Sequence, residues 1–193
     1  THFYTVITPP YQKANDEITR LNRIYMEAQM AVFPEFHFYP DANSTLRVAY
    51  GNILPYNDPT ATDGFMYSWY TTLNGVAAKE NPYIPDYEVP QRLMEFWRKK
   101  DYGRYADKID GELHTCFIAT NHTTGGNSGS PVFDANGNLI GTNFDRVWEG
   151  TMSDVCYDLQ RCRNITLDVR YTLFVIDKYA GAGYLLDEMK IVW

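Results

Sequence analysis

The chain has 193 residues, a length that suits one domain or slightly more. Its formal net charge of −7, without a basic stripe, argues against a nucleic-acid partner, and no apolar stretch is long enough for a transmembrane segment. The three cysteines form no disulfide framework and the four histidines are scattered, so we expect no metal site and no cofactor.

The N-terminal part of the chain predicts one amphipathic helix. Residues 1–10 have neither the basic nor the apolar region of a signal peptide, and Pro9 and Pro10 are expected to end this first segment. A helix is predicted over 12–32, stopped by Pro34. Its apolar residues recur at steps of three and four: Ile18, Leu21, Tyr25, Ala28 and Val32. Such a face must be buried against a partner.

Short elements separated by turn-rich segments follow this helix. Alternating apolar and polar residues predict a half-buried strand at 46–50, and residues 52–64 form a turn-rich loop. A strand at 65–72 and a short helix at 73–79 come next. Residues 89–100 indicate another helix, with Pro90 suited to its first turn.

The C-terminal half predicts several short strands, a long loop and a terminal helix. In chain order these are strands at 113–120, 132–133 and 139–146, a loop at 148–163, a strand at 165–169 and a helix at 173–179. Strands of this length with turns between them favour an antiparallel Greek-key β-barrel, within a mostly β, α+β fold.

One glycine-rich stretch suggests a catalytic serine. Residues 124–131 read Thr-Gly-Gly-Asn-Ser-Gly-Ser-Pro, which places Ser128 on a tight loop between two strands. If this loop curls as in serine proteases, the N–H groups of Gly126 and Ser128 converge on one point, where they would stabilise a developing oxyanion. The alternative is a glycine- and serine-rich surface turn, which is common in proteins.

The stretch around Ser128 resembles the nucleophile loop of chymotrypsin-like serine peptidases, with Asn127 where trypsin-like enzymes carry Asp. The longer strings at 125–132, 137–150 and 168–178 look like those of the bacterial exo-acting serine dipeptidyl-peptidases. Phe144-Asp145-Arg146 is similar to the Asp/Glu-specific branch of that family, dipeptidyl-peptidase eleven.

This resemblance implies roles for three consecutive residues. Arg146 would bind an Asp or Glu side chain at the cleaved position, because a guanidinium offers a planar fork to a carboxylate. Asp145 would bind the free ammonium group of the substrate, and Phe144 would contribute to the same substrate site. Without the resemblance, Asp145 is an ordinary surface carboxylate, and Arg146 could pair at the surface with Asp145 or Glu149.

The resemblance also implies that catalytic partners are missing from this chain. The family carries its base in an Asn-His-His-Cys-like string, which is absent, and none of the four histidines stands in a suitable position. We therefore interpret the chain as the C-terminal part of a larger peptidase. Residues 1–35 would be the tail of a helical domain and residues 36–193 a chymotrypsin-like barrel, inactive on its own.

Two other functions stay open at this stage. A glutamyl endopeptidase also carries Gly-Asn-Ser-Gly, although Phe144-Asp145-Arg146 fits it poorly, and a non-catalytic peptide-binding module could keep the fold. Members of the resembled family are homodimers that act on peptides in the periplasm or at the cell surface. Cys156 and Cys162 could pair across a loop, or all three thiols could stay reduced.

Overall fold

The computed structural model describes residues 2–36, 38, 46–57 and 66–193, and the chain divides into two units, residues 1–39 and 40–193. The predicted loop at 52–64, the start of the strand at 65–72, and His37 lie wholly or partly outside the described residues. None of the helices in the described part combines the length and apolarity that a membrane span requires.

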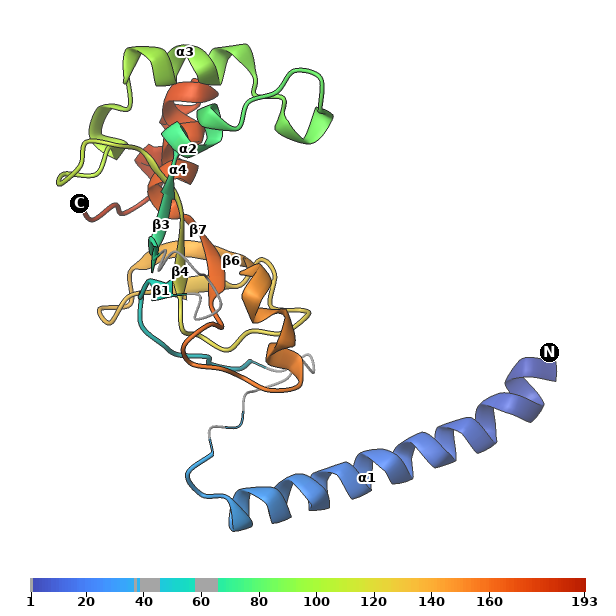
Figure 1. Cartoon of the computed structure of the whole chain (residues 1–193). Helices are drawn as coiled ribbons and strands as arrows, with labels where there is room; N and C mark the ends of the chain where they lie inside the picture. Colours follow the sequence, from blue (N-terminus) through green and yellow to red (C-terminus); the bar gives the residue numbers. More distant parts are fainter. Residues whose placement is uncertain (1, 37, 39–45, 58–65) are drawn as a thin grey trace. The chain divides into compact units, whose positions relative to one another are not determined.

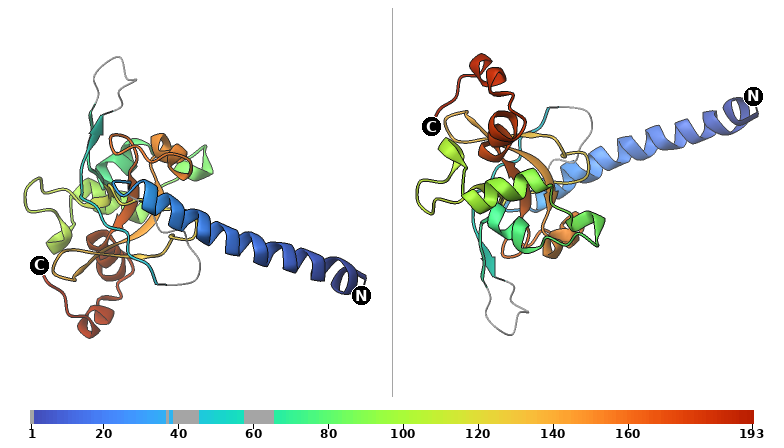
Figure 2. Two further views of the ribbon diagram at one scale, coloured as in Figure 1. Left: turned by 90° about the horizontal axis from the view of Figure 1, so that it is seen from below. Right: turned by 90° about the horizontal axis from the view of Figure 1, so that it is seen from above.

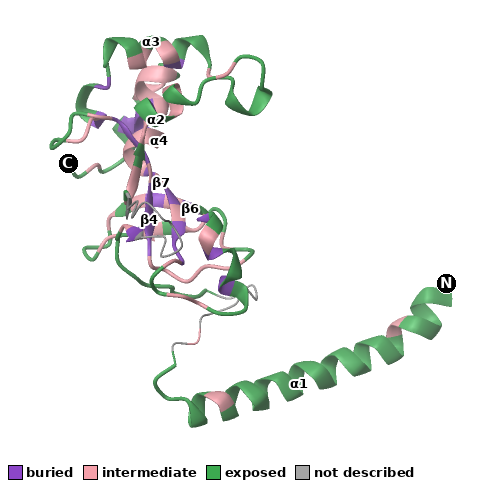
Figure 3. Cartoon of the chain, in the orientation of Figure 1, coloured by how far each residue is buried: buried purple, intermediate pink, exposed green. Residues whose placement is uncertain are grey.

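The first unit consists of a single long helix. A π-helical turn, η1 (Phe3–Ile7), leads directly into α1 (Thr8–Val32). The helix is confirmed, but the expectation that Pro9 and Pro10 end the segment before it is wrong. They stand in the first turn of α1, where a residue without an N–H loses no helical hydrogen bond. No residue of α1 is buried, so its apolar face is uncovered in this structure (Figure 3).

The second unit is organised around one antiparallel sheet (Figure 1). Its five strands lie in the order β3-β4-β7-β6-β5, and every neighbouring pair is antiparallel. The strands are β3 (Tyr70–Thr72), β4 (His114–Ala119), β5 (Pro131–Phe133), β6 (Leu139–Arg146) and β7 (Asn164–Asp168). The antiparallel arrangement agrees with the sequence, while closure into a Greek-key barrel stays a prediction.

Two predicted strands before this sheet differ from the structure. Residues 46–50 form no strand, and Leu46 is 99% exposed. Pairing begins slightly later, where Asn52 and Ile53 meet the end of β4. The predicted strand at 65–72 is interrupted, because β2 (Met66–Tyr67) pairs with β1 (Tyr56–Asn57) whereas β3 pairs with β4.

Helices and single turns complete the second unit. Helices α2 (Leu73–Ala78) and α3 (Gln91–Lys99) confirm the predictions at 73–79 and 89–100. The remaining segments are η2 (Pro85–Tyr87), η3 (Gly103–Tyr105), η4 (Trp148–Asp154), α4 (Val169–Phe174), η5 (Val175–Tyr179) and η6 (Gly183–Glu188). The predicted loop at 148–163 thus begins with a 3₁₀ segment. The terminal helix starts earlier than predicted, because the Asp168 side chain accepts a hydrogen bond from the Arg170 N–H and caps it.

Two groups of buried side chains stabilise this unit. The larger joins the helices, which gather at one end of the sheet, as Figures 1 and 2 show. Its buried members are Leu73, Leu93, Tyr102, Tyr105, Leu113, Leu173, Phe174 and Leu186. The smaller lies on the sheet and consists of Tyr56, Ile118 and Val147, with Trp69 and Ile165 beside them. The sheet therefore has its own apolar support near the end of β6.

A network of charges connects the sheet with the helical end. The Arg170 guanidinium contacts Asp168 at 2.8 Å and Asp107 at 2.7 Å, and it lies 3.2 Å from Nδ1 of His114. The other imidazole nitrogen of His114 lies 2.9 Å from Asp110, and Tyr70 stacks on the ring. The ion pair with Arg170 holds the pKa of Asp107 below its ordinary value.

Candidate active site

The loop that carries Ser128 is folded by hydrogen bonds to its own residues and to β6. The Asn127 side chain accepts from the Thr124 N–H at 2.8 Å. The Gly129 N–H donates to the Asn143 carbonyl at 2.7 Å, and the Asn143 N–H donates to the Ser130 carbonyl at 2.9 Å. Gly126 has φ of 95° and Gly129 has φ of 84°, conformations that favour glycine. The loop is thus fixed on both sides of Ser128.

The peptide bond between Asn127 and Ser128 is oriented by two hydrogen bonds. The Asn127 carbonyl accepts from the Ser130 N–H and from Nδ2 of Asn143, both at 3.1 Å. Because a trans peptide is planar, the Ser128 N–H points the opposite way. Among the described residues, neither this N–H nor that of Gly126 has an acceptor. Both donors predicted for an oxyanion hole are therefore available.

Two buried asparagines on neighbouring strands form a chain of hydrogen bonds that ends at the Asn127 carbonyl. Asn143 on β6 is 4% exposed and Asn164 on β7 is 2% exposed. Nδ2 of Asn164 donates to Oδ1 of Asn143 at 2.9 Å and to Oγ1 of Thr166 at 3.2 Å. The amide of Asn143 is thereby fixed with its Nδ2 toward Asn127. This amide relay, Thr166-Asn164-Asn143, was not predicted, although a polar residue within the apolar run 139–144 is a signal for it.

The strand β6 carries a β-bulge at Phe144. Asn143 pairs with Thr166 and Asp145 pairs with the very next residue of β7, Ile165, so Phe144 has no partner of its own. The Phe144 side chain is 44% exposed. Its carbonyl accepts a hydrogen bond of 3.1 Å from the Ser128 hydroxyl. The bulge thus brings the predicted nucleophile and the predicted substrate-binding residues together.

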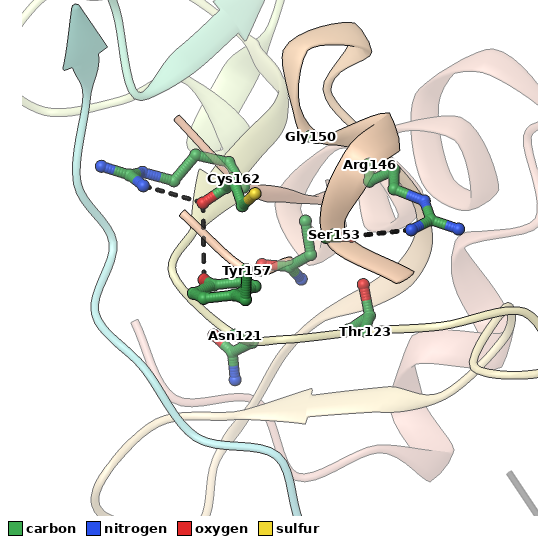
Figure 4. Close-up of a pocket in the computed structure, with 9 residues that line it drawn as sticks. Asn121, Thr123, Arg146, Gly150, Ser153, Tyr157 and Cys162 are labelled. Atoms are coloured by element: carbon green, nitrogen blue, oxygen red, sulfur yellow. Dashed lines mark hydrogen bonds between the residues drawn. The ribbon is translucent and has the colours of Figure 1, made fainter. Parts of the chain in front are cut away.

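Beside this bulge, Arg146 lines a small pocket, which is too narrow to hold a water molecule (Figure 4). The other lining residues come from three segments that meet here: Asn121, Thr123, Gly150, Ser153, Tyr157, Cys162, Arg163 and Asn164. Arg163, a second cation, is 5% exposed, and its acceptors among the described residues are the carbonyl oxygens of Leu54, Pro55, Leu159 and Cys162. Arg146, whose side chain is 24% exposed, is therefore the more accessible of the two cations that line the pocket.

The Arg146 side chain has a carboxylate partner that the sequence did not indicate. Nη1 and Nη2 donate to the two carboxylate oxygens of Asp154 at 2.9 Å and 2.8 Å, and Nη1 also donates to the Ser153 hydroxyl at 2.7 Å. This contact lowers the pKa of Asp154 and raises that of Arg146. The surface pairs considered for the Arg146 guanidinium, Asp145 and Glu149, do not form; Glu149 instead accepts from the Tyr56 hydroxyl at 2.7 Å.

Asp145 presents a carboxylate at the surface. One oxygen accepts from the Arg146 backbone N–H at 2.8 Å, and the side chain forms no ion pair within the described residues. Asp145 and Arg146 pair with successive residues of β7, so their side chains leave the sheet on opposite faces. The anion can therefore bind a cation without competing for the Arg146 guanidinium.

The described histidines of the second unit, His114 and His122, do not contact Ser128. His114 is buried in the charge network around Arg170, and His122 stacks on Tyr157 at 4.3 Å. His2 is exposed in the other unit, and His37 lies outside the described residues. Within the described part of the chain, the hydroxyl of Ser128 is held by a carbonyl rather than by an imidazole.

The cysteines and the cluster around His114 carry side chains of the kinds that bind metal ions. Cys116, Cys156 and Cys162 are all free thiols, and burial raises the pKa of Cys162. Ligand atoms of Asp107, Asp110 and His114 lie within 4.8 Å of one another, a grouping that the sequence analysis missed. Arg170 already supplies a cation to Asp107 and occupies Nδ1 of His114. This cluster is accounted for as a structural ion network.

Known proteins resemble this chain over nearly its whole length. The model of the Peptidase S46 family matches residues 3–191. The chain is 53% identical to an Asp/Glu-specific dipeptidyl-peptidase of Capnocytophaga gingivalis, over 97% of this chain and 26% of that protein. It is 47% identical to dipeptidyl-peptidase 7 of Phocaeicola vulgatus, over 89% of this chain and 23% of that protein.

A solved structure shows the same relation. The crystal structure of Porphyromonas endodontalis DPP11 in complex with the dipeptide Arg-Asp superimposes with a TM-score of 0.76 at 42% identity, covering 97% of this chain and 28% of that one. The chain thus spans about a quarter of the length of these relatives. From the family match over nearly its whole length, we conclude that this chain belongs to the Peptidase S46 family.

Proposed function

We propose that the chain is the nucleophile-bearing part of a serine dipeptidyl-peptidase that releases dipeptides ending in Asp or Glu from free peptide N-termini. One observation carries the proposal: the hydroxyl of Ser128 donates to the carbonyl of Phe144, in the same tripeptide that carries Asp145 and Arg146. The predicted nucleophile is thereby adjacent to an anion and a cation. These are the two charges that recognition of an N-terminal acidic dipeptide requires.

In this proposal each residue has a distinct role. The Ser128 oxygen attacks the carbonyl carbon of the second peptide bond, and the N–H groups of Gly126 and Ser128 stabilise the oxyanion that forms. Arg146 binds the acidic side chain at the cleaved position, Asp145 binds the N-terminal ammonium, and Phe144 contributes to the same substrate site. The general base that takes the serine proton comes from the part of the peptidase outside this chain, so the fragment alone is inactive.

The same proposal includes the organisation of the full-length peptidase. The five-stranded sheet would be the C-terminal barrel of a chymotrypsin-like pair, and α1 would be the tail of a helical domain whose other helices cover its apolar face. The full-length protein would be a homodimer in the periplasm or at the cell surface of a bacterium, where it takes peptides with free N-termini. It would need no cofactor.

The test uses the full-length enzyme and a change at Arg146. Arg146→Gly should lower kcat/KM for dipeptidyl substrates with Asp or Glu at the cleaved position by at least a hundredfold, because the planar cation is lost. Cleavage after Leu or Met should persist or rise. Arg146→Lys should restore acidic cleavage only in part, since a point charge does not reproduce the fork. Ser128→Ala serves as the inactive reference.

The two alternatives predict different outcomes. A glutamyl endopeptidase would cleave internal bonds and N-acetylated peptides as fast as peptides with a free N-terminus. A non-catalytic module would bind acidic peptides, but neither Ser128→Ala nor Arg146→Gly would change any hydrolysis rate. If Arg146→Gly cleaves acidic dipeptidyl substrates as well as the parent enzyme, the specificity assignment is wrong.

A further inference from the structure

Within the described residues, the Arg146 guanidinium is held from one end. Asp154 occupies the end formed by Nη1 and Nη2, with N–O distances of 2.9 Å and 2.8 Å, and the Ser153 hydroxyl takes the remaining N–H of Nη1 at 2.7 Å. Figure 4 shows Ser153 and the guanidinium facing each other across this contact. Three of the five N–H groups are thus satisfied by two consecutive residues.

The other edge of the same guanidinium is available. Nε and the second N–H of Nη2 have no acceptor among the described residues, and the Arg146 side chain is 24% exposed. These two N–H groups are parallel and lie along one side of the planar group, which is the geometry that a carboxylate meets with two hydrogen bonds. A second carboxylate can therefore bind Arg146 while Asp154 stays in place.

The segment that carries Ser153 and Asp154 packs closely on the rest of the second unit. The 3₁₀ segment η4 turns back immediately after β6, where the Val147 N–H donates to the Arg163 carbonyl at 3.0 Å. A Cβ at Gly150 would come within 3.4 Å of the Cys162 backbone, so this segment packs closely on the neighbouring loop. Ser153 is 3% exposed, whereas Asp154 is 53% exposed in its side chain.

We propose that Asp154, together with Ser153, is a positioning residue that holds the Nη1/Nη2 end of Arg146 and thereby presents the Nε/Nη2 edge to the acidic side chain of the substrate. This inference rests on the proposed function, in which Arg146 binds that side chain. An arginine fixed before substrate arrives loses less side-chain freedom on binding. The negative charge of Asp154 opposes the substrate carboxylate only weakly, because water screens its exposed side chain.

The opposite role would give the opposite result. If Asp154 instead competed with the substrate for the guanidinium, removing it would increase the affinity for acidic substrates. Positioning predicts that Asp154→Ala lowers kcat/KM for Asp and Glu substrates about tenfold, mainly through a higher KM. Asp154→Asn, which keeps one acceptor oxygen for the guanidinium, should lie between Asp154→Ala and the parent.

A double-variant experiment in the full-length enzyme separates this inference from the proposed function. In the Arg146→Gly background, Asp154→Ala should have no further effect on any substrate, because its target is absent. Labelling of Ser128 by a fluorophosphonate should proceed at the parent rate in Asp154→Ala, which shows that the fold and nucleophile are intact. Asp86→Ala, which removes an exposed aspartate of η2, is the matched control and should leave kcat/KM unchanged.

Each outcome is decisive. If Asp154→Ala raises or does not change kcat/KM for acidic substrates while Arg146→Gly abolishes their cleavage, the positioning role is wrong and the proposed function stands. An equal effect of Asp154→Ala with and without Arg146 also contradicts the positioning role, since Asp154 would then act elsewhere. If Arg146→Gly itself leaves acidic cleavage intact, the proposed function fails first.

Discussion

Asp145 shows how one carboxylate can be prepared for a ligand cation. Its single hydrogen bond within the described residues comes from the backbone N–H of Arg146, at 2.8 Å, and that contact orients the side chain without neutralising it. A carboxylate that is oriented but unpaired retains its attraction for an ammonium group. We therefore propose that this residue binds the N-terminal ammonium group of the substrate.

The Asp145→Asn variant tests that role in the full-length enzyme. Asparagine can keep the hydrogen bond from the Arg146 N–H, so the change removes the charge and little else. We expect kcat/KM for substrates with a free N-terminus to fall tenfold or more, because a charge-assisted contact becomes a neutral one. N-acetylated versions of the same peptides are the control, and equal rates on acetylated and free peptides in the parent enzyme would show that the ammonium is not bound.

At the residue scale, the sequence predicted groups that local motifs define and missed groups that meet only in space. The glycine pattern around Ser128 was readable because positive φ at Gly126 and Gly129 demands that residue type. The partner of Arg146 could not be predicted, because Asp154 reaches it through the turn of η4, and nothing in the sequence distinguishes Asp154 from the neighbouring acids Asp145 and Glu149.

The strand β6 is the element that organises the candidate site. Its backbone binds the Ser128 loop at Asn143, its bulge accepts the Ser128 hydroxyl at Phe144, and its end carries the two charged residues. The Asn143 side chain adds the contact to the Asn127 carbonyl that turns the Ser128 N–H outward. We infer that the amide relay contributes to catalysis through the orientation of one peptide group.

The Asn143→Ala variant tests this contribution. Loss of the amide should lower kcat about tenfold with little change in KM, since a misaligned oxyanion donor weakens transition-state stabilisation more than substrate binding. It should also lower the free energy of unfolding by about 1 to 3 kcal/mol, because the buried Asn164 amide loses one of its two acceptors and the Asn127 carbonyl loses a donor. Thr142→Ala, the neighbouring change on β6, is the control. An unchanged kcat in folded Asn143→Ala would show that the relay is structural only.

Predictions of secondary structure succeeded where periodicity was strong and failed where pairing decided the outcome. Helix α1 and the strands β4, β6 and β7 carry clear patterns and were predicted within a few residues. Residues 46–50 alternate like a strand, but the backbone contacts with β4 begin only at Asn52. A pattern of side chains cannot reveal which neighbouring strand is within reach, and strand formation depends on that neighbour.

At the scale of the whole molecule, the network around Arg170 stabilises the second unit where sheet and helices meet. It connects the segment at Asp107, the start of β4 and the junction of β7 with α4. The folded-state pKa of Asp107 is lowered, so its stabilising contribution is complete above its unfolded pKa of about 3.9. That contribution is lost as pH falls through the lower folded pKa.

The Asp107→Asn variant of this chain should therefore be less stable at neutral pH. We expect a loss of about 2 kcal/mol in the free energy of unfolding at pH 7, the range for a hydrogen bond to a charged group. The difference from the parent should narrow as pH falls through the depressed pKa of Asp107. Urea titrations followed by tryptophan fluorescence report the second unit, since all four tryptophans lie in it.

A second variant controls for the loss of a negative charge as such. Asp86→Asn removes an exposed charge on η2 and should change stability by less than about 0.5 kcal/mol. If the deficit of Asp107→Asn stayed constant across the acidic range, the ion pair would not be its cause.

The bulge at Phe144 determines which residues of β6 lie on the same face of the sheet. Residues that pair across antiparallel strands share a face, so Asn143 lies with Thr166 and Arg146 lies with Asn164. In a regular strand two residues share a face only when an even number separates their positions, yet Asn143 and Arg146 differ by three. Phe144, the unpaired residue of the bulge, is what places Asn143 and Arg146 on the same face. Insertion or deletion of one residue between Asn143 and Arg146 would turn the guanidinium to the other side of the sheet, even if both of these residues were kept. If Arg146 binds the acidic side chain as proposed, substrate preference can therefore change by exchange of that residue but not by a change in the length of β6.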